Sequence, residues 1–217
     1  MRKYGMRLLT GTLLAVSLLG AGEFDNAMEA YKKGSYIEAL NGFYILAKNG
    51  DAKAQFNVGL MYAKGEGAQK DLQKAIVWYE KAAEHDIAAA QYNLARLYHT
   101  MGTKDAHALE RARYWYEKAA QNGIKEAYNN LGALYLKGEG VKKDTNRAFS
   151  YFQKASEMGD ANAKLNLGIL YAWGEGINPD KLKAYDNLRA ALQSGQSEAQ
   201  RYLDRLCKES AWVCKGK

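Results

Sequence analysis

The chain has 217 residues, of which 47% are hydrophobic and 25% are charged, a composition typical of a folded globular protein rather than a disordered one. It contains a single proline, so nearly every segment is free to be helical. The formal net charge is +7, and it falls to +4 when the three cations among the first seven residues are set aside. The other charges alternate in sign, so the composition does not favour nucleic acid as a partner.

The N-terminus has the pattern of a secretory signal peptide. Arg2, Lys3 and Arg7 precede an uncharged, largely apolar run over residues 8–19, and small residues follow it. The run is shorter than the roughly 20 residues that span a bilayer. We therefore predict a signal over residues 1–21, cleavage after Ala21, a periplasmic or secreted protein, and no stable membrane insertion after cleavage. The alternative is a buried first helix. A lipoprotein signal needs cysteine at position 22, where this chain has Gly22.

The two cysteines, Cys207 and Cys214, predict a disulfide in an oxidising compartment. Seven residues of continuous helix would separate them by about 10.5 Å, whereas bonded cysteines have Cα atoms about 4.4–6.8 Å apart. The bond thus requires the last helix to break, and we expect the break near Ser210. The folded-back tail is then expected to bury Trp212. The alternative is two unpaired thiols.

A repeat with a period of 36 residues governs the rest of the chain. Its clearest marks are tyrosines at steps of 36, 37 and 36: Tyr62, Tyr98, Tyr135 and Tyr171. Alanines keep the same register, and in the second half of each copy the alanine follows a lysine or an arginine: Ala75, Ala112, Ala148 and Ala184. This regularity predicts stacked copies of one structural unit.

Each copy predicts two helices joined by a glycine turn. The turn glycines Gly65, Gly138 and Gly174 are expected to take the left-handed conformation that ends a helix. Asp71, Asp144 and Asp180 stand where the N-cap of the second helix is needed. One such pair leaves an apolar face uncovered, and stacking covers it.

These units resemble Sel1-like repeats, relatives of the tetratricopeptide repeat. The first full copy shows the motif as Ala54, Val58-Gly59, Tyr62, Gly65-x-Gly67, Asp71, Lys74-Ala75 and Trp78-Tyr79-x-Lys81-Ala82-Ala83. The resemblance covers about residues 25–209. It implies an all-α, right-handed α/α solenoid of about five helix pairs and a C-terminal capping helix. The expected boundaries are a signal at 1–21 and one solenoid domain at 22–217, with repeats at 22–50, 51–86, 87–123, 124–159 and 160–195 and a cap at 196–217.

The second copy departs from the motif. It has Ala95 where glycine is usual, it lacks the paired turn glycines, and its expected cap is Asp105, three residues earlier in register than the other caps. The second helix of this copy is therefore expected to start almost one turn sooner. The departure is either drift in a tolerant loop or a reshaped binding surface.

No motif indicates catalysis, a metal or a cofactor. The three histidines, His85, His99 and His107, lack metal-ligand spacing, and we interpret them as surface residues. The repeated Gly-Glu-Gly turns follow no strand and precede no Gly-Lys-Ser/Thr, so they do not match phosphate loops.

The resemblance implies binding through the concave face made by the first helix of each pair. It places on that face Phe56, Leu60, Tyr92, Arg96, His99, Asn129, Ala133, Lys137, Leu165, Ile169 and Trp173. The alternative is that several of them pack against the neighbouring unit.

The resemblance further implies a non-catalytic, monomeric scaffold that binds a protein or peptide partner. A narrower alternative is an immunity protein that neutralises a secreted effector enzyme such as a phospholipase. A second alternative is a β-lactam-binding or β-lactam-hydrolysing enzyme, but such cysteine-rich relatives carry a cysteine pair in every repeat and this chain has one pair at its end.

Overall fold

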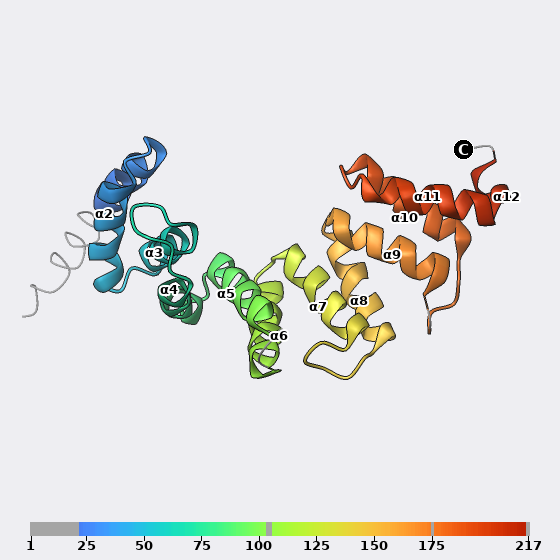
Figure 1. Cartoon of the computed structure of the whole chain (residues 1–217), viewed down its shortest axis with the longest axis horizontal. Helices are drawn as coiled ribbons and strands as arrows, with labels where there is room; N and C mark the ends of the chain where they lie inside the picture. Colours follow the sequence, from blue (N-terminus) through green and yellow to red (C-terminus); the bar gives the residue numbers. More distant parts are fainter. Residues whose placement is uncertain (1–21, 103–105, 175, 216–217) are drawn as a thin grey trace, which may run out of the picture. The chain divides into compact units, whose positions relative to one another are not determined.

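The computed structural model describes residues 22–102, 106–174 and 176–215, and these residues are helical apart from short connections (Figure 1). The predicted signal segment lies outside the described residues. The described chain divides into two compact units, one ending at Ala90 and the other beginning at Gln91.

The first unit contains helical residues 22–32, α2 (Tyr36–Lys48), α3 (Ala52–Lys64) and α4 (Leu72–Glu84), followed by the start of α5 (Ala88–Met101). Helix α2 packs on α3, and α3 packs on α4. Phe43, Val58 and Met61 are fully buried in its core, where Trp78 packs beside them.

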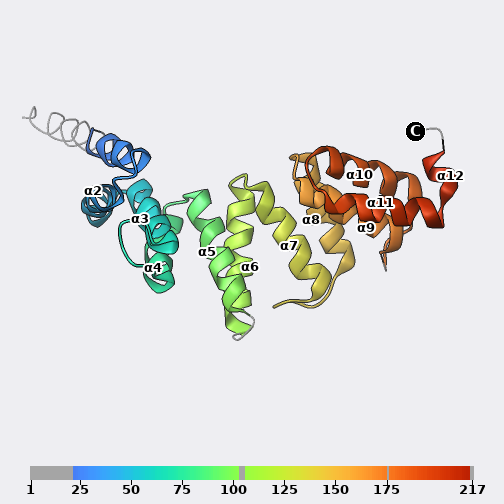
Figure 2. The ribbon, with the colours of Figure 1, turned by 45° about the horizontal axis from the view of Figure 1, so that its top comes forward.

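The second unit contains the rest of α5 and helices that pack in consecutive pairs. They are α6 (Ala106–Gln121), α7 (Lys125–Lys137), α8 (Thr145–Glu157), α9 (Ala161–Trp173), α10 (Lys181–Gln193), α11 (Glu198–Glu209) and α12 (Ala211–Cys214). Helix α7 packs on α8, α9 packs on α10, and α11 lies along α10 (Figure 2). The all-α fold of helix pairs with a terminal capping helix is confirmed.

The small residues that recur with the 36-residue period lie where helices contact each other. The repeated alanines are completely buried at Ala54, Ala75, Ala90, Ala112, Ala127, Ala148, Ala163, Ala184 and Ala199. A methyl side chain lets two helix backbones approach closely, and aromatic rings fill the space beside the contact. This packing explains why the 36-residue period is strictest at alanine.

The cation before each repeated alanine also has a structural role, which the sequence pattern did not reveal. In every full copy its charged group lies over the ring of the repeated tyrosine, at 4.9 to 5.5 Å from the ring centroid: Lys74 on Tyr62, Arg111 on Tyr98, Arg147 on Tyr135 and Lys183 on Tyr171. A cation is attracted to the electron-rich face of an aromatic ring, by about 0.5–1 kcal/mol at exposed sites. Each pair ties the second helix of a copy to its first.

The predicted N-caps are confirmed. The carboxylates of Asp71, Asp144 and Asp180 each accept a hydrogen bond from the backbone N–H three residues later, at 2.9 to 3.0 Å. Asp105 lies outside the described residues, but α6 has 16 residues against 13 in α4 and α8, so the expected early start is confirmed. Two further caps, Asp51 and Asp160, begin the first helices α3 and α9.

Two of the three turn glycines have the predicted left-handed conformation, with φ of 80° at Gly65 and 76° at Gly138. The prediction is wrong for Gly174, whose φ is −70° and ψ 132°. Pro179 stands in that turn where the other two turns have Lys70 and Lys143. The proline ring fixes its own φ and restricts the residue before it, so this turn follows a different path.

Replacing Gly138 with valine is expected to destabilise the protein by about 1–2 kcal/mol, because a β-branched residue is strained at positive φ. Asparagine tolerates this region, so Gly138→Asn is the matched control and should cost clearly less. Thermal or denaturant unfolding measures both. Equal stability of the valine variant and the wild type would mean that the helix does not end at this glycine.

Asp160 differs from the other caps because it is buried, and burial raises the pKa of its carboxyl above the ordinary value of 3.8. Ionisation therefore costs more in the folded state than in the unfolded state, and stability falls as pH rises through the window just above that value. Asp160→Asn keeps an acceptor for the Ala163 N–H and removes the charge. We compare the melting temperature of this variant with that of the wild type at two pH values. We expect the difference, variant minus wild type, to be more positive at pH 7 than at pH 3.5.

Asp160→Ala is the control in the same thermal unfolding experiments. It removes the N-cap hydrogen bond at either pH, so it should lower stability by about 1 kcal/mol at both. A pH-independent difference between Asp160→Asn and the wild type would contradict the proposed ionisation.

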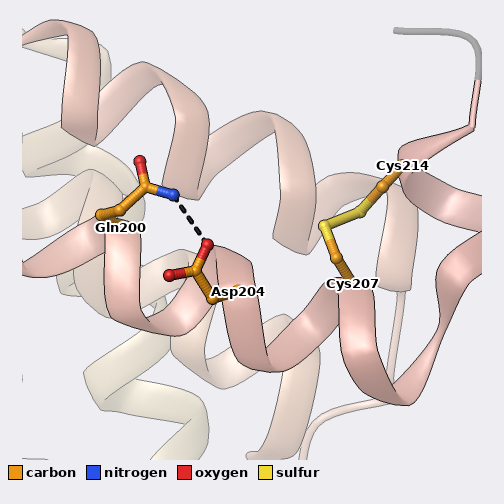
Figure 3. Close-up of a disulfide and its surroundings, with 4 residues drawn as sticks. All are labelled: Gln200, Asp204, Cys207 and Cys214. Atoms are coloured by element: carbon orange, nitrogen blue, oxygen red, sulfur yellow. Dashed lines mark hydrogen bonds between the residues drawn. A yellow bond between two sulfur atoms is a disulfide. The ribbon is translucent and has the colours of Figure 1, made fainter.

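The C-terminal disulfide is formed between Cys207 on α11 and Cys214 on α12, with Cα atoms 5.7 Å apart (Figure 3). As predicted, the helix breaks at Ser210, whose φ is −144°. The expected burial of Trp212 is wrong: this side chain is 62% exposed, and its neighbour Val213 is 2% exposed. The short helix α12 packs on α10 and α11, and successive side chains of a helix point in different directions, so only one of the two apolar neighbours faces inward.

Candidate binding face

The residues predicted to bind lie on the first helices α3, α5, α7 and α9, and we call the side of α5, α7 and α9 that carries those of the second unit the first-helix face. In the first unit the predicted residues are Phe56 and Leu60 of α3, both half-buried. The Phe56 ring lies 5.9 Å from the ring of Tyr79, which is buried on α4. The rest of the predicted residues belong to the second unit.

On α5 the structure brings Tyr92, Arg96 and His99 into one connected cluster around Tyr116. The Arg96 guanidinium lies 5.8 Å from the Tyr92 ring centroid. The rings of Tyr92 and His99, two helical turns apart on α5, each lie 6.0 Å from the ring of the buried Tyr116. Burial raises the pKa of Tyr116, so its hydroxyl stays protonated.

The cluster continues onto the turn after α7 through an acidic residue. His99 Nε2 lies 3.1 Å from Glu139 Oε2, and Lys137 Nζ lies 3.6 Å from the other oxygen of the same carboxylate. His99 is therefore half-buried and held by neighbours rather than the simple surface residue expected from the sequence. His85 and His107 are exposed, as expected.

Asn129 and the predicted residues of α9, the first helix of the last Sel1 repeat, are used mainly for contacts between repeats. The amide of Asn166 on α9 donates to Asn129 Oδ1 at 2.9 Å. Leu165 is 6% exposed, and it packs in the core that the last helices form, with Ile169 and Trp173 against it.

Trp173 is held by the capping helix. Its indole N–H donates to Glu209 Oε2 at 2.7 Å, and the Arg205 guanidinium lies 4.4 Å from its ring centroid. At this end of the first-helix face, the predicted residues pack against neighbouring helices, which was the alternative to a role in binding. Along α5 and α7, Arg96 and Lys137 are exposed, and Tyr92, His99 and Asn129 are half-buried.

Four consecutive segments match the Sel1 repeat: residues 52–87, 88–124, 125–160 and 161–196. The chain belongs to the Sel1 repeat family. Each matched segment begins with a first helix. The helix pair formed by residues 22–32 and α2 precedes the first matched Sel1 repeat.

Solved Sel1 repeat structures share the fold. A Sel1 repeat protein from Oxalobacter formigenes is 34% identical and has a TM-score of 0.78, covering 91% of this chain and 82% of that one. The immunity protein Pa5087 from Pseudomonas aeruginosa is 24% identical with a TM-score of 0.51, covering 80% of this chain and 68% of its own, and it shows the fold alone.

Among curated proteins, DAP3-binding cell death enhancer 1 of Rattus norvegicus is 34% identical over 70 residues. These residues are 32% of this Sel1 chain and 14% of the rat protein. The chain thus matches about a seventh of that relative's length.

Within the described ranges, no group of three or more histidine, cysteine, aspartate or glutamate side chains is placed to hold a metal ion. In the same ranges, no helix is long and apolar enough to cross a membrane. The Cys207–Cys214 bond fits an oxidising compartment.

One surface was missed by the sequence reasoning: the outer side of α2, where Ile37 is 70% and Ile45 is 59% exposed. A register comparison finds it, because the position of Ile45 is occupied by Lys81, Lys118 and Lys154 in the first three Sel1 repeats and by Ala190 in the fourth.

Proposed function

We propose that the protein is a non-catalytic scaffold of the bacterial periplasm, acting as a monomer, that binds a protein or peptide through the first-helix face. The observation that carries this proposal is the cluster of Tyr92, Arg96 and His99 around Tyr116. It combines aromatic and cationic side chains outside the repeated core, and tyrosine and arginine dominate the binding energy of protein interfaces.

The cluster is also pre-ordered. Arg96 lies over Tyr92, and His99 is held between Glu139 and Tyr116. Side chains that are already fixed lose little conformational freedom on binding, so more of the contact energy remains as affinity. The predicted signal segment and the disulfide support a periplasmic location.

The test is affinity capture from a periplasmic extract, followed by mass spectrometry and measurement of the captured partner's affinity. Tyr92→Ala/Arg96→Ala is expected to weaken binding at least tenfold, which is about 1.4 kcal/mol. The matched control is Tyr114→Ala/Lys118→Ala, because this pair has the same spacing on the second helix α6 and Lys118 lies 5.9 Å from the Tyr114 ring centroid. Equal losses in the two variants would refute the assignment to the first-helix face.

The immunity role is a narrower form of the same proposal, in which the partner is a secreted effector enzyme such as a phospholipase. Co-purification with, and inhibition of, an effector encoded by a neighbouring gene is its specific test. The enzyme alternative draws no support from the cysteines. In the cysteine-rich relatives a pair recurs in every repeat, whereas here the single pair closes the C-terminal tail.

A further inference from the structure

A second surface of unusual composition lies beside the loop between α7 and α8. A depression of about 770 Å³ is lined by residues of α6, of this loop and of the start of α8. A second depression of about 400 Å³ continues along α8, and the two share Asp144, Asn146 and Arg147. We call the two together the α8 trough.

The α8 trough is rich in cations. Its lining includes Arg113, Lys142, Lys143, Arg147 and Lys154. Two carboxylates, Glu110 and Asp144, belong to the same lining. The Asp144 carboxylate is already engaged in capping α8. Lys142 and Lys143 are exposed, and neither forms an ion pair within the described part of the chain.

One arginine of this lining, Arg113, breaks the repeat pattern. Arg113 directly follows the repeated alanine of α6, and the same register position is apolar or aromatic in every other second helix: Leu40, Ile76, Phe149 and Tyr185. Packing alone would favour such a residue here as well. Instead the Arg113 guanidinium is half-buried and held by Glu117 at 2.8 Å.

The two loop lysines occur side by side in this copy alone. The corresponding turns carry Gln69-Lys70 and Asn178-Pro179, so Lys142 is specific to this copy and Lys143 has one lysine counterpart. The loop is also fixed on α6, because Gly140 approaches so closely that a Cβ at this position would stand 2.5 Å from the Cβ of Leu109. The cations therefore surround a depression whose walls are already in place before a ligand binds.

We propose that the α8 trough binds an acidic peptide segment of a partner protein, whose carboxylates pair with Arg113, Arg147 and the two loop lysines. Arginine guanidinium groups and lysine ammonium groups form charge-assisted hydrogen bonds with carboxylates. The volume is that of a ligand pocket, which suits a short segment. This inference rests on the proposed scaffold function and adds a second contact site for the partner.

The test measures fluorescence anisotropy of a labelled short polyglutamate peptide, with a polyglutamine peptide of equal length as reference. Polyglutamate is expected to bind the disulfide-bonded protein at least tenfold more tightly than polyglutamine, and added salt should weaken it. Lys142→Gln/Lys143→Gln should weaken binding by about tenfold or more. The control Lys32→Gln/Lys33→Gln removes the same charge from adjacent exposed lysines of the first unit and should leave binding within about twofold.

Arg113→Ile is the sharpest variant, because it restores the residue type of the other repeats. It should melt no lower than wild type and yet bind polyglutamate about tenfold more weakly. Unchanged binding by both trough variants, or equal loss in the lysine control, would overturn the proposal. Tighter binding of tripolyphosphate or of a single-stranded oligonucleotide than of polyglutamate would overturn the assignment to a peptide. If the protein captures a partner but does not bind polyglutamate, the binding role of the α8 trough alone is refuted. If it binds polyglutamate but no partner is captured, the scaffold function is refuted.

Discussion

Truncation of Phe152 to alanine is expected to cost about 3–5 kcal/mol of unfolding free energy, the largest effect of any single substitution considered for this chain. The Phe152 ring is fully buried between α7 and α8 and lies directly against Gly132. Removing it opens a cavity that the two rigid helices close only in part. Chemical denaturation measures the loss, and Phe149→Ala, a half-buried ring on the same helix, is the matched control with a smaller expected cost.

Gly132, which the Phe152 ring contacts, allows a second test of the same packing. A Cβ at Gly132 would stand 2.6 Å from the Phe152 ring, so Gly132→Ala overpacks the contact and should cost about 1–3 kcal/mol. In the Phe152→Ala background the same methyl group has space, so the cost should shrink or reverse. Additive losses in the double mutant would show that the two residues are not in contact.

Breaking the Cys207–Cys214 bond is expected to lower stability by about 2–3 kcal/mol, from the chain entropy that the closed loop removes from the unfolded state. The double variant Cys207→Ser/Cys214→Ser and the reduced wild type should melt at the same lower temperature. Because the bond is remote in sequence from α5, capture of a partner through Tyr92 and Arg96 should be little changed.

The buried residue of the tail provides a control for this interpretation. Val213→Ala should destabilise the oxidised protein measurably, whereas Trp212→Ala should change its stability by less than about 0.5 kcal/mol, because Trp212 is exposed. Two reactive thiols in the folded, secreted protein would contradict the disulfide. Lost partner binding without lost stability on reduction would instead give the cysteines a functional role.

Much of this fold was predictable from the sequence because its signals are local. The aspartate caps and the left-handed glycines Gly65 and Gly138 each depend on residues only a few positions apart along the chain, and the 36-residue register repeats such a local pattern. The break at Ser210 followed from a comparable local constraint, since two cysteines seven residues apart cannot bond across a continuous helix. The residues that belong to the first-helix face were likewise implied by their register.

Only the tertiary structure decided which of these residues remain accessible. Leu165 has the same register as the half-buried Phe56, Tyr92 and Asn129, but it is buried in the core that the last helices form. Trp173 is held by Glu209 of the capping helix α11. The local pattern likewise gave no sign that Val213 rather than Trp212 turns inward, or that Arg113 and the loop lysines share one depression. The physical reason is that exposure and charge clustering depend on neighbours about one repeat away in sequence, whose side chains meet only when the helix pairs pack together.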